Sequence, residues 1–362
     1  MIKNIPYLLA LHSIVGLGPV RLKVLIEHFK DPKIAWEAIS KELLKIGIPK
    51  NVVDLLVETR NNMDPQTYAN DIRDVGIKWI TIYEESYPNL LKQIYDPPIV
   101  LYYKGVFPVA GEKAIAVVGT RKMTGYGKIV TDQFTRELVN AGLTIVSGLA
   151  RGVDSQAHLS ALEANGRTIA ILGGGLNQIY PPENRGLADK IIDGHGAIIS
   201  EFPPDYPSLP GNFPARNRII SGLSLAVLVT EAAEDSGSLI TARAAVEQGR
   251  EVFAVPGPIT SNLSKGPIDL IKEGAKPVTE VEEILEELGI SKVKSSKLKI
   301  QSEIEVSESE KKILDCLENE NRHIDEICRN LNLSASLVSA NLLKMEIAGL
   351  VQNLGSGNYC KT

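Results

Sequence analysis

The sequence predicts an α/β protein with a mostly parallel sheet, between a helical N-terminal segment and a small C-terminal domain. Residues 114–127, AIAVVGTRKMTGYG, read as a buried strand, a glycine loop and the start of a helix. The same unit recurs along 143–274, where short apolar strands alternate with segments of helical period. Hydrophobic residues make up 44% of the chain, which is typical of a globular protein.

The net charge and the cysteine content limit which partners and which redox environment suit this protein. The formal net charge is −5 over 362 residues, so a polyanionic partner must be held by a local basic cluster. Three cysteines lie far apart near the C-terminal end and form neither a zinc-ligand pattern nor a disulfide framework. These cysteines are Cys316, Cys328 and Cys360, and their spacing indicates a reducing, cytoplasmic setting.

Residues 1–18, MIKNIPYLLALHSIVGLG, carry an apolar run that is too short and too interrupted to span a membrane. No small-residue cleavage site follows it, which disfavours a signal peptide. We therefore expect this segment to belong to a folded domain, and we expect no membrane partner.

Residues 1–65 predict a helical domain. Within it, Ile14–Phe29 has two glycines before an amphipathic helix and resembles the helix–hairpin–helix motif of SAM-like domains. Such a turn exposes N–H groups that can hold a phosphate of duplex DNA without reading bases. A second, looser copy lies at 44–59. The alternative, a packing module whose glycines cap helices, stays open. The candidate backbone contacts are Gly16, Gly18 and Lys23, with Lys30 as a helper.

Residues 66–288 predict the main domain. Residues 72–81 read as a helix end and a short strand, and Ile99–Tyr103 predict an edge strand in which Tyr102 and Tyr103 pack. The further strands are predicted at 143–147, 168–172, 197–200, 225–230 and 251–255. The further helices are predicted at 154–165, 184–193, 216–222, 239–248 and 267–274.

In a parallel sheet, every loop from a strand to the next helix leaves the same carboxyl edge. The predicted loops at that edge hold glycines, cations, hydroxyls and one aromatic ring, whereas the loops at the opposite edge are short and plain. We therefore predict a binding site at the carboxyl edge. Its candidate residues are Gly119, Arg121, Lys122, Gly148, Arg151, Gly174, Phe213, Arg216, Asn217, Arg218, Ser236, Gly237 and Ser238.

These donors and cations suit several phosphates in a row, and Phe213 supplies a ring on which a base can stack. The combination is typical of single-strand binding. Phe213 could instead be a core residue, and Arg216 and Arg218 could form salt bridges with Glu201 and Glu231. Because residues two apart on a helix face different directions, we expect at least one of these arginines to have a structural role.

The predicted edge lacks the signatures of common nucleotide sites. Residues 119–127 are not G-x-G-x-x-G, and the next strand ends at Ser147 rather than at an acidic residue, which disfavours dinucleotide binding. No triphosphate-binding loop is present. Asp154, Glu201 and Glu231 could hold a divalent ion, but each also suits a helix cap or an arginine partner. We expect the latter roles, and neither a metal nor a cofactor.

Residues 289–307 are polar and rich in serine and lysine, which predicts a linker. Residues 308–362 predict a winged-helix domain with helices at 311–317, 324–330 and 334–348 and a wing around Gly355-Ser356-Gly357. The third helix offers only Asn341 and Lys344 for reading bases. We therefore expect a protein-contact or regulatory role for this domain.

Seven segments, in this order, resemble the DNA-processing protein A (DprA/Smf) family: VGTR (118–121), IVSGLARGVDSQAH (145–158), YPPEN (180–184), ISEFPP (199–204), FPARNRIISGLS (213–224), EAAEDSGSLITA (231–242) and VPGPI (255–259). The resemblance spans about 86–275 and implies an extended Rossmann-like core. By position it implies DNA contacts at Arg121, Phe213, Arg216 and Arg218. Members can carry a lysine shortly before the Phe213 position, whereas Ser208–Asn212 contain none here.

The resemblance also implies a function. It implies single-stranded DNA as a ligand, a homodimer, loading of the RecA recombinase onto incoming DNA in natural transformation, and no established catalytic activity. Two alternatives stay open. One is a nucleotide-processing enzyme similar to phosphoribohydrolases, which Gly237–Thr241 and Glu247 loosely resemble. The other is an adaptor that its helix–hairpin–helix tethers to duplex DNA.

Overall fold

The computed structural model describes residues 3–108, 111–194, 196–290, 307–317, 322–347, 350–355 and 357–361. The chain divides into two compact units, Met1–Val293 and Lys294–Thr362. The predicted linker lies mostly outside the described residues, at 291–306.

The first unit is built on one sheet. Among its described residues, the strand order is β1-β2-β6-β5-β4-β3-β7-β8-β9. From β6 to β9 all pairs are parallel, whereas β2 is antiparallel to β6 and β1 is antiparallel to β2. The strands are β1 (Lys78–Thr81), β2 (Val100–Gly105), β3 (Ala114–Val118), β4 (Thr144–Ser147), β5 (Thr168–Ile171), β6 (Ala197–Ser200), β7 (Ala226–Val229), β8 (Glu251–Ala254) and β9 (Lys276–Pro277).

Burial explains why the strands follow the apolar runs of the sequence. Every residue of β3, β4, β5, β6 and β7 is buried, as expected for strands that are covered on both faces. The five strands predicted from residue 143 onward are confirmed to within one residue at each end. The predicted edge strand is corrected, because β2 lies inside the sheet and β1 forms the edge.

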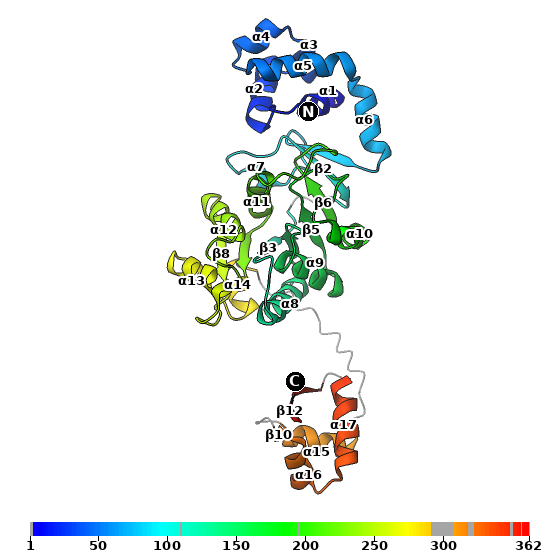
Figure 1. Ribbon diagram of the computed structural model, residues 1–362, viewed down its shortest axis with the longest axis vertical. Coiled ribbons are helices and arrows are strands. Elements are labelled where there is room, and N and C mark those ends of the chain that lie inside the picture. Colours follow the sequence, from blue (N-terminus) through cyan, green and yellow to red (C-terminus); the bar gives the residue numbers. More distant parts are fainter. Residues whose placement is uncertain are drawn as a thin grey trace. The chain divides into compact units, whose positions relative to one another are not determined.

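Helices cover both faces of the sheet (Figure 1). One face packs against α7 (Asn89–Lys92), α11 (Asn212–Gly222), α12 (Ser238–Glu247) and α13 (Lys265–Lys272). The other face packs against α8 (Gly125–Asn140), α9 (Val153–Glu163) and α14 (Val281–Glu287). Next to β6 lies α10 (Arg185–Asp193), which follows the short 3-10 turn Pro182–Asn184; a second turn, Asn262–Ser264, precedes α13.

Strands β3 and β7 are neighbours in the sheet, and the chain leaves them in opposite directions. From β3 it continues through β4 and β5 to β6 on one side, and from β7 through β8 to β9 on the other. Such a reversal point leaves a crevice at the carboxyl ends of the two strands, where ligands of doubly wound sheets bind.

The N-terminal helices pack beyond the β1–β2 end of the sheet (Figure 1). They are α1 (Ile5–His12), α2 (Pro19–Phe29), α3 (Pro32–Glu37), α4 (Ser40–Lys45), α5 (Lys50–Asn62) and α6 (Pro65–Asp74). Leu8 and Leu11 of α1 share one hydrophobic cluster with Tyr102 of β2, whose hydroxyl lies 3.2 Å from Nδ1 of His12. The helices before the predicted domain boundary at residue 65 therefore pack directly against the sheet that follows it.

Each of the two predicted copies of the motif places a glycine between two helices. Gly16 stands between α1 and α2 with a φ of 94°, and Gly47 stands between α4 and α5 with a φ of 88°. At Gly16, Nη1 of Arg21 donates to the carbonyl oxygen at 2.8 Å. Contact with a DNA backbone at Gly16, Gly18 and Lys23 stays a prediction.

The second unit has the predicted helices and wing. Helix α15 spans Glu308–Cys316, α16 spans Ile324–Leu331 and α17 spans Ala335–Ile347, and its sheet has the order β10-β12-β11. The strands are β10 (Arg322–His323), β11 (Val351–Gly355) and β12 (Asn358–Lys361). Of the predicted wing, Gly349 and Ser356 lie outside the described residues. Over the described residues of both units, no helix is long and apolar enough to cross a membrane.

His158 of α9 gives a prediction about stability. The side chain is fully buried, its Nδ1 lies 2.7 Å from the Thr168 hydroxyl, and burial lowers its pKa from 6.5 to about 3. In the unfolded chain His158 therefore becomes protonated as the pH falls below about 6.5, whereas in the folded chain it stays neutral down to about pH 3. The stability from neutral His158 is complete above that pH and falls as the pH decreases toward 3.

We expect the wild-type protein to lose about 1.4 kcal/mol per pH unit relative to His158→Gln over this window. Urea unfolding of both proteins at several pH values below neutrality measures the difference. Parallel pH curves would show that the imidazole is not held neutral.

Candidate nucleic-acid interface

An open cleft of about 790 Å³ lies at the carboxyl ends of β3 and β7. Its lining comes from the loop after β3, the loop after β4 with the start of α9, residue Tyr180, the start of α11, the start of α12 with the residues before it, and Leu263. Of the predicted site residues, the structure brings together Gly119, Arg121, Lys122, Phe213, Arg216, Asn217, Ser236, Gly237 and Ser238.

The loop after β3 is held by Glu231, which follows β7. The Glu231 carboxylate accepts hydrogen bonds from the Thr124 amide at 2.9 Å and from its hydroxyl at 2.6 Å. Thr124 also caps α8 by accepting from the Gly127 amide at 3.1 Å. A Cβ on Gly119 would lie 2.6 Å from the Glu231 carbonyl oxygen, so only glycine fits this position.

Arg121 and Phe213 meet at the mouth of the cleft. The exposed guanidinium of Arg121 lies over the Phe213 ring, 5.7 Å from its centre, and has no ion-pair partner in the part of the chain described. The Tyr180 ring also lies beside Phe213, with 5.6 Å between the two ring centres. Lys122 is also exposed. Two cations therefore border an aromatic surface that solvent reaches.

The start of α12 supplies two hydroxyl groups. The Ser236 and Ser238 hydroxyls lie 2.8 Å apart, and the side-chain amide of Asn217 donates to the Gly237 carbonyl at 3.1 Å. Asn217 thus orients this turn from α11. The backbone amides of Ser236, Leu239 and Ile240 already donate to carbonyl oxygens of the turn, so the hydroxyls and the partial positive charge of the helix start are what suits a phosphate.

Arg216 forms the floor of the cleft rather than its mouth. Its side chain is 4% exposed, and its guanidinium donates to the Ile171 carbonyl oxygen. Burial lowers the pKa of Arg216 to about 10, although Asp154 opposes this shift. Burial also raises the pKa of the Asp154 carboxyl, which accepts from the Gly148 amide at 3.1 Å.

Four predicted site residues lie outside the cleft, each for a physical reason. A Cβ on Gly148 would lie 1.9 Å from Nη1 of Arg216, so this glycine makes room for a guanidinium instead of a ligand. Gly174 packs against Ser208 in the same way, with 2.3 Å between a Cβ and the hydroxyl oxygen. Arg151 pairs at the surface with Glu183.

Arg218 is the fourth. Its guanidinium binds Glu201 at 2.7 Å and Asp96 at 2.8 Å, and its side chain is only 14% exposed. Because two residues span about 200° of a helix, Arg218 points away from the cleft that Arg216 faces. The alternative of a structural salt bridge with Glu201 is therefore correct for Arg218, whereas Glu231 binds Thr124 and pairs with no arginine among the described residues.

The cleft also contains residues that the sequence reasoning did not assign to the site, among them Thr120, Tyr180, Pro210, Asp235 and Leu263. Tyr180 stands at the start of the YPPEN segment, so an aromatic residue directly before two prolines was the available signal.

The carboxylates considered as metal ligands, and the α17 side chains considered for reading bases, also have contacts in the structure. Asp154, Glu201 and Glu231 are each engaged in the contacts above, and no cluster of possible metal ligands occurs within the described residues. In the second unit, Lys344 of α17 pairs with Glu310 at 2.8 Å. One of the two side chains available for reading bases is thus already engaged.

The fold and the site define a doubly wound α/β protein with a cationic, aromatic crevice at its switch point. The family model described as DNA recombination-mediator protein A matches residues 78–289, and that of the DprA winged helix domain matches 299–357. The chain belongs to the DNA recombination-mediator protein A (DprA/Smf) family.

Individual relatives agree with this assignment. Protein Smf of Synechocystis is 37% identical over 95% of this chain and 96% of its own length. The DNA processing protein DprA of Bacillus subtilis is 49% identical over 70% of this chain and 83% of its own length.

Two solved structures are also similar. DprA of Streptococcus pneumoniae has a TM-score of 0.69 at 36% identity and covers 79% of this chain and 99% of its own. DprA of Helicobacter pylori has a TM-score of 0.51 at 32% identity and covers 58% of this chain and 95% of its own; its structure addresses the single-stranded DNA binding mode of that protein.

The two ion pairs of Glu201 and Glu183 predict a contrast in stability. Glu201→Gln leaves Arg218 buried with only part of its charge balanced, and we expect a loss of about 3 kcal/mol in the free energy of unfolding. The matched control is Glu183→Gln, which removes an exposed pair and should cost less than about 1 kcal/mol. Urea unfolding measures both, and equal losses would contradict the structural role of Arg218.

Proposed function

We propose that the cleft binds single-stranded DNA and that the protein acts without catalysis in processing incoming DNA during natural transformation. The observation that carries the proposal is the Arg121–Phe213 pair, an exposed cation above a half-buried ring. Sequence-independent binding of single strands combines these elements, since the cation binds the phosphate and the ring stacks on a base.

A single strand suits this cleft better than a duplex. The face of a base can reach the Phe213 ring only where the strand is unpaired and its bases are free to turn outward. The turn at Ser236–Ser238 then offers hydroxyl donors to a neighbouring phosphate. The H. pylori relative, for which single-stranded DNA binding is described, supports the same ligand.

The further steps of the proposal follow from family membership. We infer that the protein works in the cytoplasm as a homodimer and loads the RecA recombinase onto the bound strand. The family description as a recombination mediator supports this role.

The first test compares two arginine–aromatic pairs. We expect Arg121→Ala to weaken binding of a labelled oligo-dT and to reduce the slope of log K against log salt by about 0.7, because one phosphate contact is lost. Phe213→Ala should cost about 1–3 kcal/mol per stacked base. Fluorescence anisotropy at several salt concentrations measures both effects.

Arg73→Ala is the matched control. Arg73 also lies over an aromatic ring, 4.8 Å from the centre of Trp79, but in α6 and outside the cleft. Its removal should leave affinity and salt slope unchanged. Wild-type affinity in both Arg121→Ala and Phe213→Ala would remove the cleft as the DNA site.

A second test addresses the enzymatic alternative. Incubation of the protein with nucleoside monophosphates should release no free base, as followed by chromatography. Release of base that Ser238→Ala abolishes would instead assign a phosphoribohydrolase-like reaction to the start of α12.

A further inference from the structure

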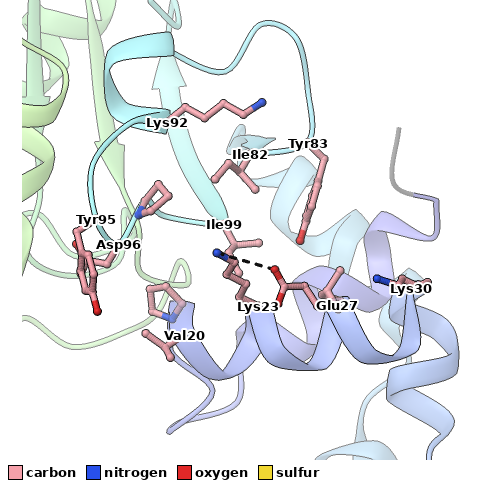
Figure 2. A pocket seen from close by; sticks show the side chains of 13 residues that line it. Val20, Lys23, Glu27, Lys30, Ile82, Tyr83, Lys92, Tyr95, Asp96 and Ile99 are labelled. Atoms are coloured by element: carbon pink, nitrogen blue, oxygen red, sulfur yellow. Dashed lines mark ion pairs between the residues drawn. The ribbon is translucent and has the colours of Figure 1, made fainter.

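A second hollow lies outside the cleft, between α2 and the segment that follows β1. Its volume is about 830 Å³, and Figure 2 shows Val20, Lys23 and Glu27 of α2 on one side with Tyr83 and Tyr95 on the other. The α2 side precedes residue 78, where the matched family domain begins. We call this hollow the α2 groove.

The α2 groove is mainly apolar. Ile26 and Ile99 are buried beneath it, and Ile82 and Pro97 also line it. At its rim, Val20 is 67% exposed and Tyr95 is fully exposed. An apolar floor with apolar side chains left in water at its rim gains free energy when other apolar side chains cover it.

The charges around the groove do not balance. Lys23 lies 3.9 Å from Glu27, and the Asp96 carboxylate is paired with Arg218 at 2.8 Å (Figure 2 shows the first pair). Lys30 and Lys92 have no ion-pair partner in the described part of the chain. The groove therefore combines an apolar floor with surplus positive charge.

We propose that the α2 groove binds a short amphipathic segment of a partner protein, with apolar side chains on the floor and carboxylates near Lys30 and Lys92. The length of the groove suits a short peptide segment, because α2 forms one of its sides and the eleven residues of α2 span about 16 Å. Helix-in-groove recognition uses such a surface, and complementary charge selects the partner.

Other occupants fit less well. A second copy of this chain in a two-fold contact would bring the same lysines against each other. A nucleic acid would leave the apolar floor uncovered and would bring its phosphates near Glu27 and Asp96. These carboxylates and the floor favour a peptide.

The test uses two fluorescent peptides of about twelve residues with leucines at the same helical positions. One has glutamate at the remaining positions, and the other has lysine. The full chain should bind the Leu/Glu peptide about tenfold more tightly than the Leu/Lys peptide. Lys30→Glu combined with Lys92→Glu should reverse this preference.

Val20→Glu should weaken the Leu/Glu peptide about tenfold. The matched control is Val246→Glu, which places the same charge on a valine of α12 that is 66% exposed and outside the groove. Both valines are exposed, so folding should persist, and thermal unfolding checks this. Equal affinity for the two peptides, or insensitivity to Val20→Glu, overturns the proposal. The proposal is also overturned if Lys30→Glu combined with Lys92→Glu abolishes binding of duplex DNA and leaves binding of the Leu/Glu peptide unchanged.

Discussion

The burial of the Arg216 guanidinium is the constraint on which the architecture of the cleft depends. A charge in the interior is tolerated only with partners, and Arg216 is surrounded by the Asp154 carboxylate and the Ile171 carbonyl oxygen. The missing side chain at Gly148 provides the space. One side chain thus links the ends of β4 and β5 to α11, and it fixes the helix that carries Phe213.

The cleft therefore has a buried floor and an exposed mouth, and the two parts have different roles. The floor holds the buried Arg216 guanidinium and the buried Asp154 carboxylate, whose opposite charges stabilise one another. The mouth holds Arg121, Lys122 and the ring of Phe213, which solvent reaches. Arg218, on the opposite side of α11, anchors the same helix through Glu201 and Asp96. Positioning and ligand contact are therefore assigned to different arginines.

The sequence predicted the sheet well because continuous apolar runs and glycine breaks are local signals, and the strands from 143 onward ended within one residue of prediction. It placed the start of α11 at Arg216, four residues late, because Pro214 reads as a break although proline fits a first helical turn. It could not decide which arginine faces the cleft. The three successive glycines Gly173–Gly175 are typical of backbone that a ligand can approach closely, yet Phe213, Ser208 and Pro204 fill those spaces from segments distant in sequence.

The contact of Glu231 with two glycines limits how this chain can vary. A methyl group on Gly127 would lie 2.1 Å from the Glu231 carboxylate, and one on Gly119 would meet its backbone. Position 127 can therefore gain a side chain only if position 231 gives up its carboxylate, whereas the backbone itself keeps position 119 a glycine at the junction of the two halves of the sheet.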